Sequence, residues 1–318
     1  MRVAVTGSGG RLGRALVAAL EEAPFTGPFG PIAWRRPAFD LDAPEGFAAL
    51  LDRHRPEVVV HAAAWTDVDG CARDPDLAMA RNGAATTRLA EACVARSIDL
   101  VVVSTNEVFD GARSDGLGYG VDDPVNPLNA YGRSKLAGEV GSRAAFETGD
   151  DASPARGDTS VAGGGPALGI VRTAWLYGPP GNDFPAKILD AADRARASSE
   201  PLRLVADETG SPTYSHDLAD AIVELVGAAQ IAGTHHIVNS GSATRAEWAR
   251  ELLRQAGVAV ATDDVPASTW PRPSTPPAWA VLEPTPLPGR EPLRQWRVAL
   301  ADYLPQLMRE RTAARAGR

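Results

Sequence analysis

The sequence of 318 residues has few cysteines, no long apolar run and no excess of positive charge. It has only two cysteines, Cys71 and Cys93, which we expect to be reduced, unpaired thiols of a cytoplasmic protein. No apolar run is long enough to cross a membrane, and a strand-like segment begins almost at Met1 in place of a signal peptide. The net charge of -8 argues against general affinity for nucleic acid. We therefore expect neither nucleic acid nor membrane as a partner.

The remaining composition is that of an ordinary globular protein. Hydrophobic residues make up 44% and charged residues 23% of the chain. The length suits one large α/β domain or one and a half.

A glycine-rich turn follows the first predicted strand, residues 2–6, and leads into a predicted helix. Gly7 permits the tight turn, Gly10 lets the backbone approach a pyrophosphate, and Gly13 lets the helix pack close to the strand. The free N–H groups at the start of the helix then face the phosphates. This context predicts a dinucleotide site, and a merely flexible turn is the weaker alternative at this position. The residues expected to bind the cofactor here are Gly7, Gly9, Gly10, Arg11, Leu12 and Gly13.

The second predicted strand, residues 31–34, ends in Arg35 and Arg36. An acidic residue at this position would hold a ribose 2′-hydroxyl, whereas arginine suits a 2′-phosphate. The pair therefore predicts NADPH as the cofactor, the alternative being two solvated charges on a loop. Asp40 and Leu41 follow about where the chain should pass the adenine. Small residues after the third predicted strand, 57–61, allow a close approach of backbone to the cofactor: Ala62, Ala63, Ala64 and Thr66.

Polar residues follow the fourth predicted strand, residues 98–103. Side chains just beyond the carboxyl end of a strand occupy the crevice where open α/β sheets bind ligands. Ser104, Thr105, Asn106 and Glu107 stand in this position. In the helix predicted from residue 74 to about 96, Asn82 is either solvated or bonded to backbone near the active site.

Tyr131 and Lys135 lie one turn apart in a helix-forming run. A phenol loses its proton near pH ~10, and an adjacent ammonium favours the phenolate and lowers its pKa. The pair is therefore a plausible general-acid device for an oxygen that becomes an alkoxide. Taken alone, Tyr-x-x-x-Lys is more often a plain surface turn, so the other motifs decide.

With these residues in hand, the chain resembles the extended short-chain dehydrogenase/reductase superfamily and, within it, the dTDP-4-dehydrorhamnose reductases. The resemblance runs from Val3 to about Leu304. The glycine motif and the Tyr/Lys pair belong to the whole superfamily, and the other blocks are more specific. The matching blocks are residues 7–13, 58–66, 104–105, 108–111, 126–135, 172–178 and 210–213.

The resemblance implies an α/β fold, a Rossmann-like doubly wound parallel sheet with a smaller substrate-binding lobe. We expect the NADP-binding Rossmann domain in residues 1–173 with 206–241, and the lobe in residues 174–205 with 242–304. Residues 146–165 have little to bury and are interpreted as a flexible insertion at the end of the sheet away from the cofactor. Residues 305–318 are expected to form a tail that is frayed near its basic end.

The resemblance also assigns roles to residues. Thr105 would hydrogen-bond the C4 carbonyl of a nucleotide-linked, dTDP-type 4-keto-6-deoxyhexose, and Tyr131 would protonate the new alkoxide. Lys135 would bind the nicotinamide ribose and keep the tyrosine acidic, while NADPH supplies the hydride. Further cofactor contacts are expected from Asn82 and Ser104. Substrate contacts are expected from Thr105, Asn106, Glu107, Phe109 and Trp175, the last of which either lines a pocket or packs in the core.

The chain departs from the reductase pattern at three places. Relatives have Asp-Tyr after the Ser-Thr pair, where Asn106 and Glu107 stand here. Residues 276–283 lack the Arg, Ser and Asp of a segment that approaches the sugar, so the resemblance leaves the exact sugar open. Some members bind magnesium through a glutamate at the position of Ala15, so we expect no metal. A homodimer is an assembly that the sequence leaves open.

Two other functions compete with a reductase. A sugar-nucleotide dehydratase or epimerase of the same superfamily is one, although dehydratases carry Thr-Asp-Glu where Thr105, Asn106 and Glu107 stand here. Asparagine cannot donate a proton as a carboxylic acid does, and Arg35 with Arg36 argues against an unphosphorylated NAD. The other is a non-catalytic, NADP-binding regulatory subunit, against which the intact Thr105 argues.

Overall fold

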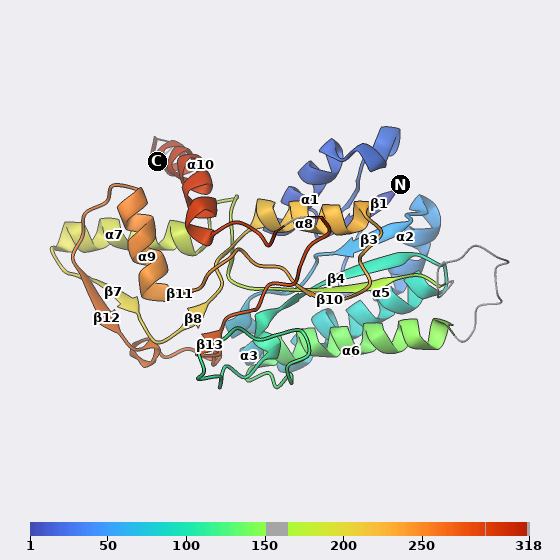
Figure 1. Ribbon diagram of the computed structural model, residues 1–318, viewed down its shortest axis with the longest axis horizontal. Coiled ribbons are helices and arrows are strands. Elements are labelled where there is room, and N and C mark those ends of the chain that lie inside the picture. The colour runs from blue at the N-terminus through green and yellow to red at the C-terminus, as the bar shows by residue number, and fades with distance from the viewer. Residues whose placement is uncertain (151–164, 290, 317–318) are drawn as a thin grey trace.

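The computed structural model describes residues 1–150, 165–289 and 291–316 (Figure 1). A sheet flanked by helices forms the larger part of the molecule, and a smaller lobe lies at one end. Of the expected insertion at residues 146–165, residues 151–164 lie outside the described residues. Residues 146–150 are instead the end of helix α6, where Phe146 is buried in the core.

The central sheet of the described chain has six strands, and every neighbouring pair in it is parallel. The chain starts inside the sheet and winds outward in both directions, as predicted. The switch in direction falls between β1 and β3, and the carboxyl ends of strands at such a point form a ligand crevice. In spatial order the strands are β10 (Gly233–His236), β5 (Leu168–Thr173), β4 (Asp99–Thr105), β3 (Val58–His61), β1 (Val3–Thr6) and β2 (Ile32–Trp34).

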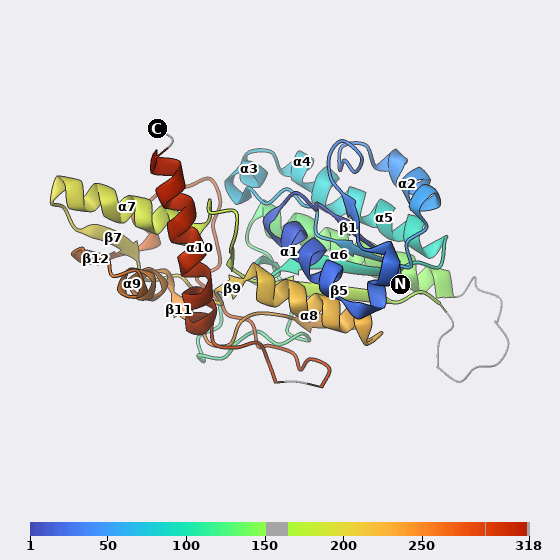
Figure 2. The same ribbon diagram turned by 90° about the horizontal axis from the view of Figure 1, so that it is seen from above.

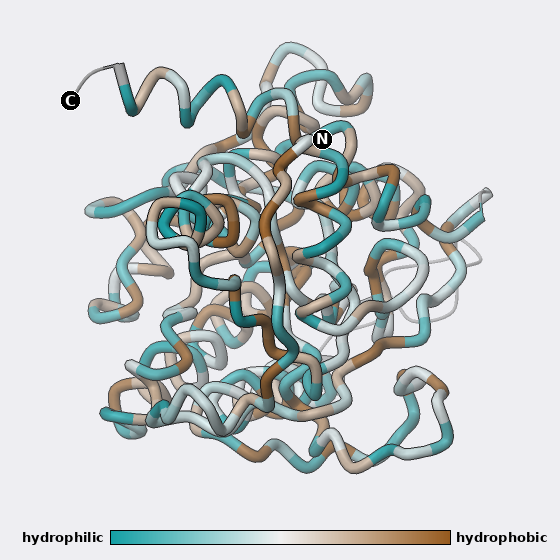
Figure 3. Tube along the Cα trace, turned by 90° about the vertical axis from the view of Figure 1, so that its left-hand side faces the viewer, coloured by the Kyte–Doolittle hydropathy of each residue, from teal (hydrophilic) through white to brown (hydrophobic). Residues whose placement is uncertain are grey.

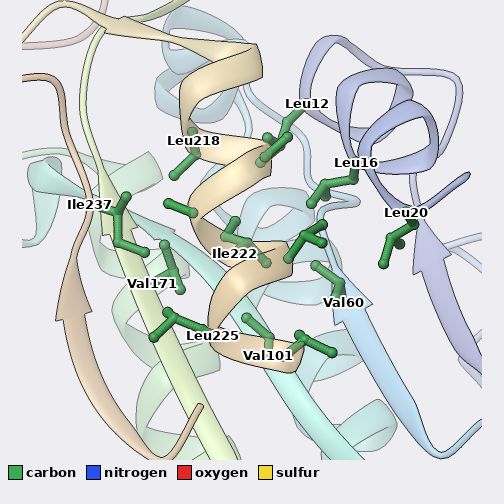
Figure 4. Packing of buried hydrophobic residues seen from close by; sticks show 14 of the residues in the cluster. Leu12, Leu16, Leu20, Val60, Val101, Val171, Leu218, Ile222, Leu225 and Ile237 are labelled. Carbon is green, nitrogen blue, oxygen red and sulfur yellow. The ribbon is translucent and has the colours of Figure 1, made fainter. Parts of the chain in front are cut away.

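Helices cover both faces of this sheet (Figure 1). Val3 and Val5 pack on one face with α1 (Arg11–Glu22) and α8 (Ser215–Gly227), as Figure 4 shows for this cluster. Ala4, between the two valines, belongs to the core on the other face. Alternate residues of a strand point to opposite faces, so these short apolar strands supply both cores. The second core is covered by α2 (Phe47–His54), α5 (Ala85–Val94) and α6 (Ala130–Asp150).

The helix predicted over residues 74–96 is built in three pieces. Helix α4 (Pro75–Ala78) leads into a π-helical turn (Met79–Ala84) and then into α5. A further helix, α3 (Val68–Arg73), precedes them and was not predicted from the sequence. Asp67 and Asp74 cap α3 and α4 by accepting hydrogen bonds from Gly70 N and Leu77 N.

The smaller lobe has its own apolar core. Trp248, Trp296 and Tyr303 are buried in it, and they come from α9 (Arg245–Gln255) and α10 (Trp296–Ala316). The other elements of this core are α7 (Phe184–Ser198) and β7 (Leu202–Val205), which pairs with β12 (Thr262–Val265). Figure 2 shows α7, α9 and α10 together at one end of the molecule.

The C-terminal residues expected to form a tail are part of this lobe. Helix α10 continues to Ala316, and Leu307 is fully buried in the lobe core. Arg311 forms ion pairs with Asp190 and, at 2.7 Å, with Asp193 of α7. In Figure 3 the segment that ends at the C label projects from one side of the molecule and includes several hydrophilic residues. The prediction of a tail at residues 305–316 is therefore wrong, and residues 317–318 lie outside the described part.

Short elements complete the described chain. They are β6 (Leu176–Tyr177), β8 (Thr209–Gly210), β9 (Thr213–Tyr214), β11 (Ala243–Thr244), β13 (Trp279–Ala280) and the 3-10 turns Pro24–Phe29, Pro44–Gly46, Asn106–Val108 and Ala267–Thr269. None of the helices within the described ranges is both long and apolar enough to span a membrane.

Candidate active site

A cavity of about 900 Å³ lies beyond the carboxyl ends of β1, β3 and β4 and is also lined by residues of the smaller lobe. Its volume suits a large ligand. Most of the predicted site residues line it: Gly7, Gly9, Gly10, Arg11, Leu12, Gly13, Arg35, Arg36, Leu41, Ala62, Ala63, Ala64, Thr66, Ser104, Thr105, Asn106, Glu107, Tyr131, Lys135 and Trp175.

The glycine turn at one end of the cavity is packed as its motif predicts. Gly7 has φ +64, and a Cβ on it would lie 2.8 Å from Ala63 Cα. A Cβ on Gly13 would lie 2.2 Å from the carbonyl oxygen of Gly7, so only glycine lets α1 start this close to the turn. His61 supports the turn from below: it is fully buried, and its Nδ1 lies 2.8 Å from Thr6 Oγ1. His61 is therefore a packed, hydrogen-bonded residue of strand β3.

Arg11 reaches from the glycine turn to the segment that enters the smaller lobe. Its Nε donates to the carbonyl oxygen of Gly178 at 2.8 Å, and its Nη2 donates to Asn182 Oδ1 at 2.7 Å. The side chain therefore joins the predicted cofactor turn to the start of the lobe.

Cations gather where the predicted 2′-phosphate would lie. The Arg36 guanidinium lies 3.2 Å from Asp40 and 3.5 Å from Asp42, whereas the Arg35 guanidinium has no protein partner among the described residues. Arg81, which the sequence did not single out, forms two 2.6 Å hydrogen bonds to Asp42 and holds the pKa of that carboxyl below its usual range. Asp40 does not itself line the cavity, and its carboxylate pairs with Arg36, which does. Its predicted contact with the cofactor stays a prediction.

The three predicted catalytic residues meet at the inner end of the cavity. Thr105 ends β4, while Tyr131 and Lys135 lie on the first two turns of α6. Thr105 and Tyr131 both line the cavity, and Thr105 lies close enough to lower the pKa of the Tyr131 hydroxyl. A Cβ on the intervening Gly132 would lie 2.1 Å from the carbonyl oxygen of Glu107, so glycine lets α6 approach the end of β4. Strand β4 and helix α6 therefore bring the triad together.

The electrostatics of Tyr131 and Lys135 differ from the prediction. Burial raises the pKa of Tyr131, and the carboxyl group of Glu107 raises it further, whereas the hydrogen bond with Thr105 acts in the opposite direction. Burial also lowers the pKa of Lys135 to about 8, and Glu139 partly opposes that shift. The expected lowering of the tyrosine pKa by the lysine is therefore wrong for this protein. Spacing on a helix does not reveal that Lys135 is buried and Tyr131 partly buried in the fold.

Ser104 faces a buried ion pair beneath the triad. Its hydroxyl donates to Glu139 Oε1 at 2.5 Å, and Arg172 donates to Glu139 Oε2 at 2.8 Å. Because Glu139 lies one turn after Lys135, these bonds connect β4, β5 and α6 under the site. Ser104 thus lines the cavity while its hydroxyl supports the catalytic helix.

Two predicted site residues lie behind the cavity wall. Asn82 is 1% exposed, and its side chain bonds both the N–H and the carbonyl of Trp65. Of the two predictions for Asn82, the one bonded to backbone near the site is therefore confirmed. The structure corrects the prediction that Asn82 contacts the cofactor. Phe109 is fully buried and stacks on Tyr119 at 4.3 Å between ring centroids, so the predicted substrate contact is corrected to a core role.

The family of the chain follows from comparison with known proteins. The family model described as RmlD substrate binding domain matches residues 1–149 and 151–309. The chain belongs to this family. It is 38% identical over 324 residues to a dTDP-4-dehydrorhamnose reductase of Streptomyces griseus, with 99% of this chain and 95% of that protein covered.

Solved structures agree with the sequences. The structure of a dTDP-4-dehydrorhamnose reductase from Clostridium acetobutylicum has a TM-score of 0.83 and 28% identity, and it covers 97% of this chain and 100% of that one. That of the Bacillus anthracis enzyme in complex with NADP has a TM-score of 0.81 and 28% identity, with 96% and 99% covered. The predicted resemblance to this reductase family and the predicted Rossmann-like fold are confirmed.

Within this RmlD-family site, the far wall of the cavity contains residues that sequence reasoning missed. Arg245 lines the cavity with its guanidinium carbon 3.8 Å from the ring centroid of Trp175, and its Nε donates to Glu208 at 3.2 Å. Trp175, with φ +39, also stacks on Trp248, so it both lines the cavity and joins the lobe core. Thr244 and Glu247 form a capping box at the start of α9, a pattern that the sequence shows locally. Nothing in that local pattern indicated that the arginine inside it faces the cavity.

Proposed function

We propose that the chain is an NADPH-dependent reductase of a dTDP-linked 4-keto-6-deoxyhexose, of the dTDP-4-dehydrorhamnose reductase type. The observation that carries the proposal is the meeting of Thr105, Tyr131 and Lys135 in the cavity that begins at the glycine turn. Relatives named as dTDP-4-dehydrorhamnose reductases over nearly the whole chain, one solved with NADP, support the same activity.

The triad can supply what carbonyl reduction requires of a protein. The hydroxyl of Tyr131 and, once it turns away from Asn106 Oδ1, that of Thr105 can donate hydrogen bonds to one carbonyl oxygen, which polarises it. The raised pKa keeps the Tyr131 phenol protonated at neutral pH, so it is available as an acid. Its proton can pass to the alkoxide, because an alcohol is a weaker acid than a phenol. Bound NADPH supplies the hydride.

Lys135 is placed to assist this proton transfer from one turn along the helix. Its side chain is 3% exposed, and a positive charge in such surroundings stabilises a developing phenolate more than it would in water. In the same position it can donate hydrogen bonds to a cofactor ribose. Arg35, Arg36 and the neighbouring Arg81 would face the 2′-phosphate that distinguishes NADPH from NADH.

The dehydratase alternative is disfavoured by the surroundings of Asn106. Its Nδ2 donates to the carbonyl oxygen of Ala280 at 3.2 Å, and its Oδ1 accepts from the Thr105 hydroxyl at 3.3 Å. The side chain therefore anchors β13 beside the triad and offers no acidic proton for the loss of a hydroxyl group.

The direct test is an assay with purified enzyme, NADPH and dTDP-4-keto-6-deoxyhexoses, including dTDP-4-dehydrorhamnose. We expect oxidation of NADPH in step with formation of the 4-hydroxy sugar. An enzyme that binds NADPH but oxidises it with none of these sugars would contradict the proposal and favour the regulatory-subunit alternative. Loss of water from a dTDP-hexose that still carries its 6-hydroxyl group, without net oxidation of NADPH, would favour the dehydratase alternative.

A further inference from the structure

Glu107 is a carboxylate in the active-site cavity that the proposed reduction does not use. It lies two residues beyond Thr105, and its backbone N–H donates to Thr105 Oγ1 at 3.2 Å. It lines the cavity together with Thr105 and Tyr131, and its charge is close enough to affect the pKa of Tyr131. Reduction of a ketone needs a hydride and one acid, and Tyr131 provides the acid. The structure therefore contains an additional proton acceptor next to the reacting carbonyl.

Asn129 holds this carboxylate in a defined position. Its Nδ2 donates to Glu107 Oε2 at 2.6 Å, and its Oδ1 accepts from the N–H of Gly132 at 2.8 Å. The same amide group thus ties the carboxylate to the helical turn that carries Tyr131. Glu107 Oε1 has no protein partner among the described residues. One carboxylate oxygen is fixed and the other is available to a ligand.

The surroundings of Glu107 suit a base. Burial raises the pKa of this carboxyl group, while the hydrogen bond from Asn129 and the charges of Arg245 and Arg272 oppose that shift. A carboxylate whose pKa lies closer to the working pH accepts protons more readily than a solvated one. It is also next to the two hydroxyls that would polarise a ketone, and hydrogen on a carbon beside a polarised ketone is acidic.

We propose that Glu107 is a general base that removes a proton from a carbon next to the C4 ketone, giving the enzyme an enolisation activity in addition to reduction. This rests on the proposed function, because the ketone held by Thr105 and Tyr131 is what makes that hydrogen acidic. The substrate class is the 4-keto-6-deoxyhexose itself, in a complex that has no hydride to deliver.

The step is a reversible proton transfer. The C–H bond next to C4 breaks, and an O–H bond forms on Glu107. The electron pair of the C–H bond forms the C=C bond of an enolate, whose oxygen accepts hydrogen bonds from Thr105 and Tyr131. Return of a proton from Glu107 to the same face of the same carbon restores the ketone. Because the carboxyl proton exchanges with solvent, the net result in D₂O is replacement of one hydrogen by deuterium without oxidation or reduction.

The test follows deuterium in dTDP-4-keto-6-deoxy-D-glucose incubated in D₂O with the enzyme and NADP⁺, by proton NMR and mass spectrometry. We expect incorporation at a carbon next to C4 at least about 10² times faster than without enzyme, the usual scale for general-base catalysis. Glu107→Gln keeps the size of the side chain and an acceptor for Asn129 but cannot take a proton. Its exchange should fall to within a few-fold of the rate without enzyme, whereas Glu107→Asp should retain part of the activity.

The proposal would be overturned if the parent enzyme incorporated deuterium into the sugar no faster than the solution without enzyme. It would also be overturned if the Glu107→Gln enzyme incorporated deuterium as fast as the parent. Circular dichroism and NADP⁺ binding establish that each variant is folded. Reduction by NADPH, measured on the same preparations, separates the two claims. A parent that reduces without exchanging disproves the enolisation and leaves the proposed reductase intact. A parent that exchanges without reducing supports Glu107 as a base and contradicts the proposed reductase.

Discussion

Arg172 and Glu139 form a two-point ion pair beneath the candidate active site. Nε of Arg172 donates to Glu139 Oε1 at 3.1 Å and Nη2 to Oε2 at 2.8 Å, and the two side chains are 4% and 1% exposed. Glu139 also accepts from Ser104, the neighbour of Thr105, and it follows Lys135 by one helical turn. The pair therefore lies where it can hold the strand end and the helix of the triad in register.

Arg172→Met should destabilise the protein strongly, because it leaves Glu139 buried without its main partner. Loss of one member of a buried pair costs about 3–5 kcal/mol in the free energy of unfolding. Arg143→Met is the matched control: Arg143 Nη2 lies 3.6 Å from the same carboxylate and the side chain is 39% exposed. Because this contact is longer and its guanidinium is partly exposed, we expect it to contribute less, on the order of 1 kcal/mol. Urea unfolding of both variants compares them, and equal losses would contradict the role given to Arg172.

Gly13→Ala should abolish or severely weaken cofactor binding. The new methyl group would lie 2.2 Å from the carbonyl oxygen of Gly7 and 2.7 Å from Ser8 Cα, so the turn or the helix must move. Gly46→Ala is the control outside the cavity, since a Cβ there has no atom within 4 Å. Titration with NADPH, followed by fluorescence, measures the affinity of both variants for the cofactor. Similar affinities for the two variants would show that close packing at Gly13 does not shape the site.

Arg35 should contribute more than Arg36 to the preference for NADPH. Arg36 is already paired with Asp40 and Asp42, whereas the Arg35 guanidinium has no protein partner among the described residues. We expect the ratio of kcat/KM for NADPH to that for NADH to fall by more in Arg35→Ala than in Arg36→Ala. Equal use of the two cofactors by the parent enzyme would contradict the assignment of this end of the cavity.

Activity should decline as pH rises through the pKa of Lys135, which burial lowers from 10.5 to about 8. Above about pH 8 the folded protein loses the positive charge that assists Tyr131, so kcat should fall there. Stability should change in the opposite direction. Between about pH 8 and 10.5 the unfolded lysine binds a proton that the folded one does not, so the Lys135 contribution to stability rises with pH. A kcat that stays constant to pH 10 would contradict this account of Lys135.

Features with a local physical cause could be predicted from the sequence. The glycines of residues 7–13 create a turn from their own backbone freedom, and the β-branched runs indicated the central strands. Together with the Tyr/Lys spacing, these patterns located the cavity and most of its lining. Trp175 lines the cavity and also packs in the lobe core. The sequence therefore could not decide whether it lines a pocket or belongs to the core.

Features that depend on packing between distant segments could not be predicted. Arg245 and Arg81 line the cavity only because folding brings α9 and the π-helical turn beside it. The prediction of a frayed tail was wrong because Arg311 forms ion pairs with Asp190 and Asp193, which lie more than a hundred residues away in the sequence. The direction of the Tyr131 shift was wrong because burial, which the spacing does not report, exceeds the effect of a neighbouring ammonium. The three residues of the predicted triad do line one cavity, and the pKa shift expected for Tyr131 was wrong.

The central claim is that the Tyr131 hydroxyl is the acid of a ketone reduction, and single-turnover reduction by Tyr131→Phe tests it most directly. The substitution removes one oxygen and leaves the ring. Tyr119→Phe is the matched control, because the Tyr119 hydroxyl donates to Asp110 and does not line the cavity. With NADPH and a dTDP-4-keto-6-deoxyhexose, Tyr131→Phe should lower the rate of reduction by ~10²–10⁴, the usual contribution of general acid catalysis, while NADPH still binds. A Tyr131→Phe enzyme that binds NADPH and reduces the sugar within tenfold of the parent rate would contradict the account.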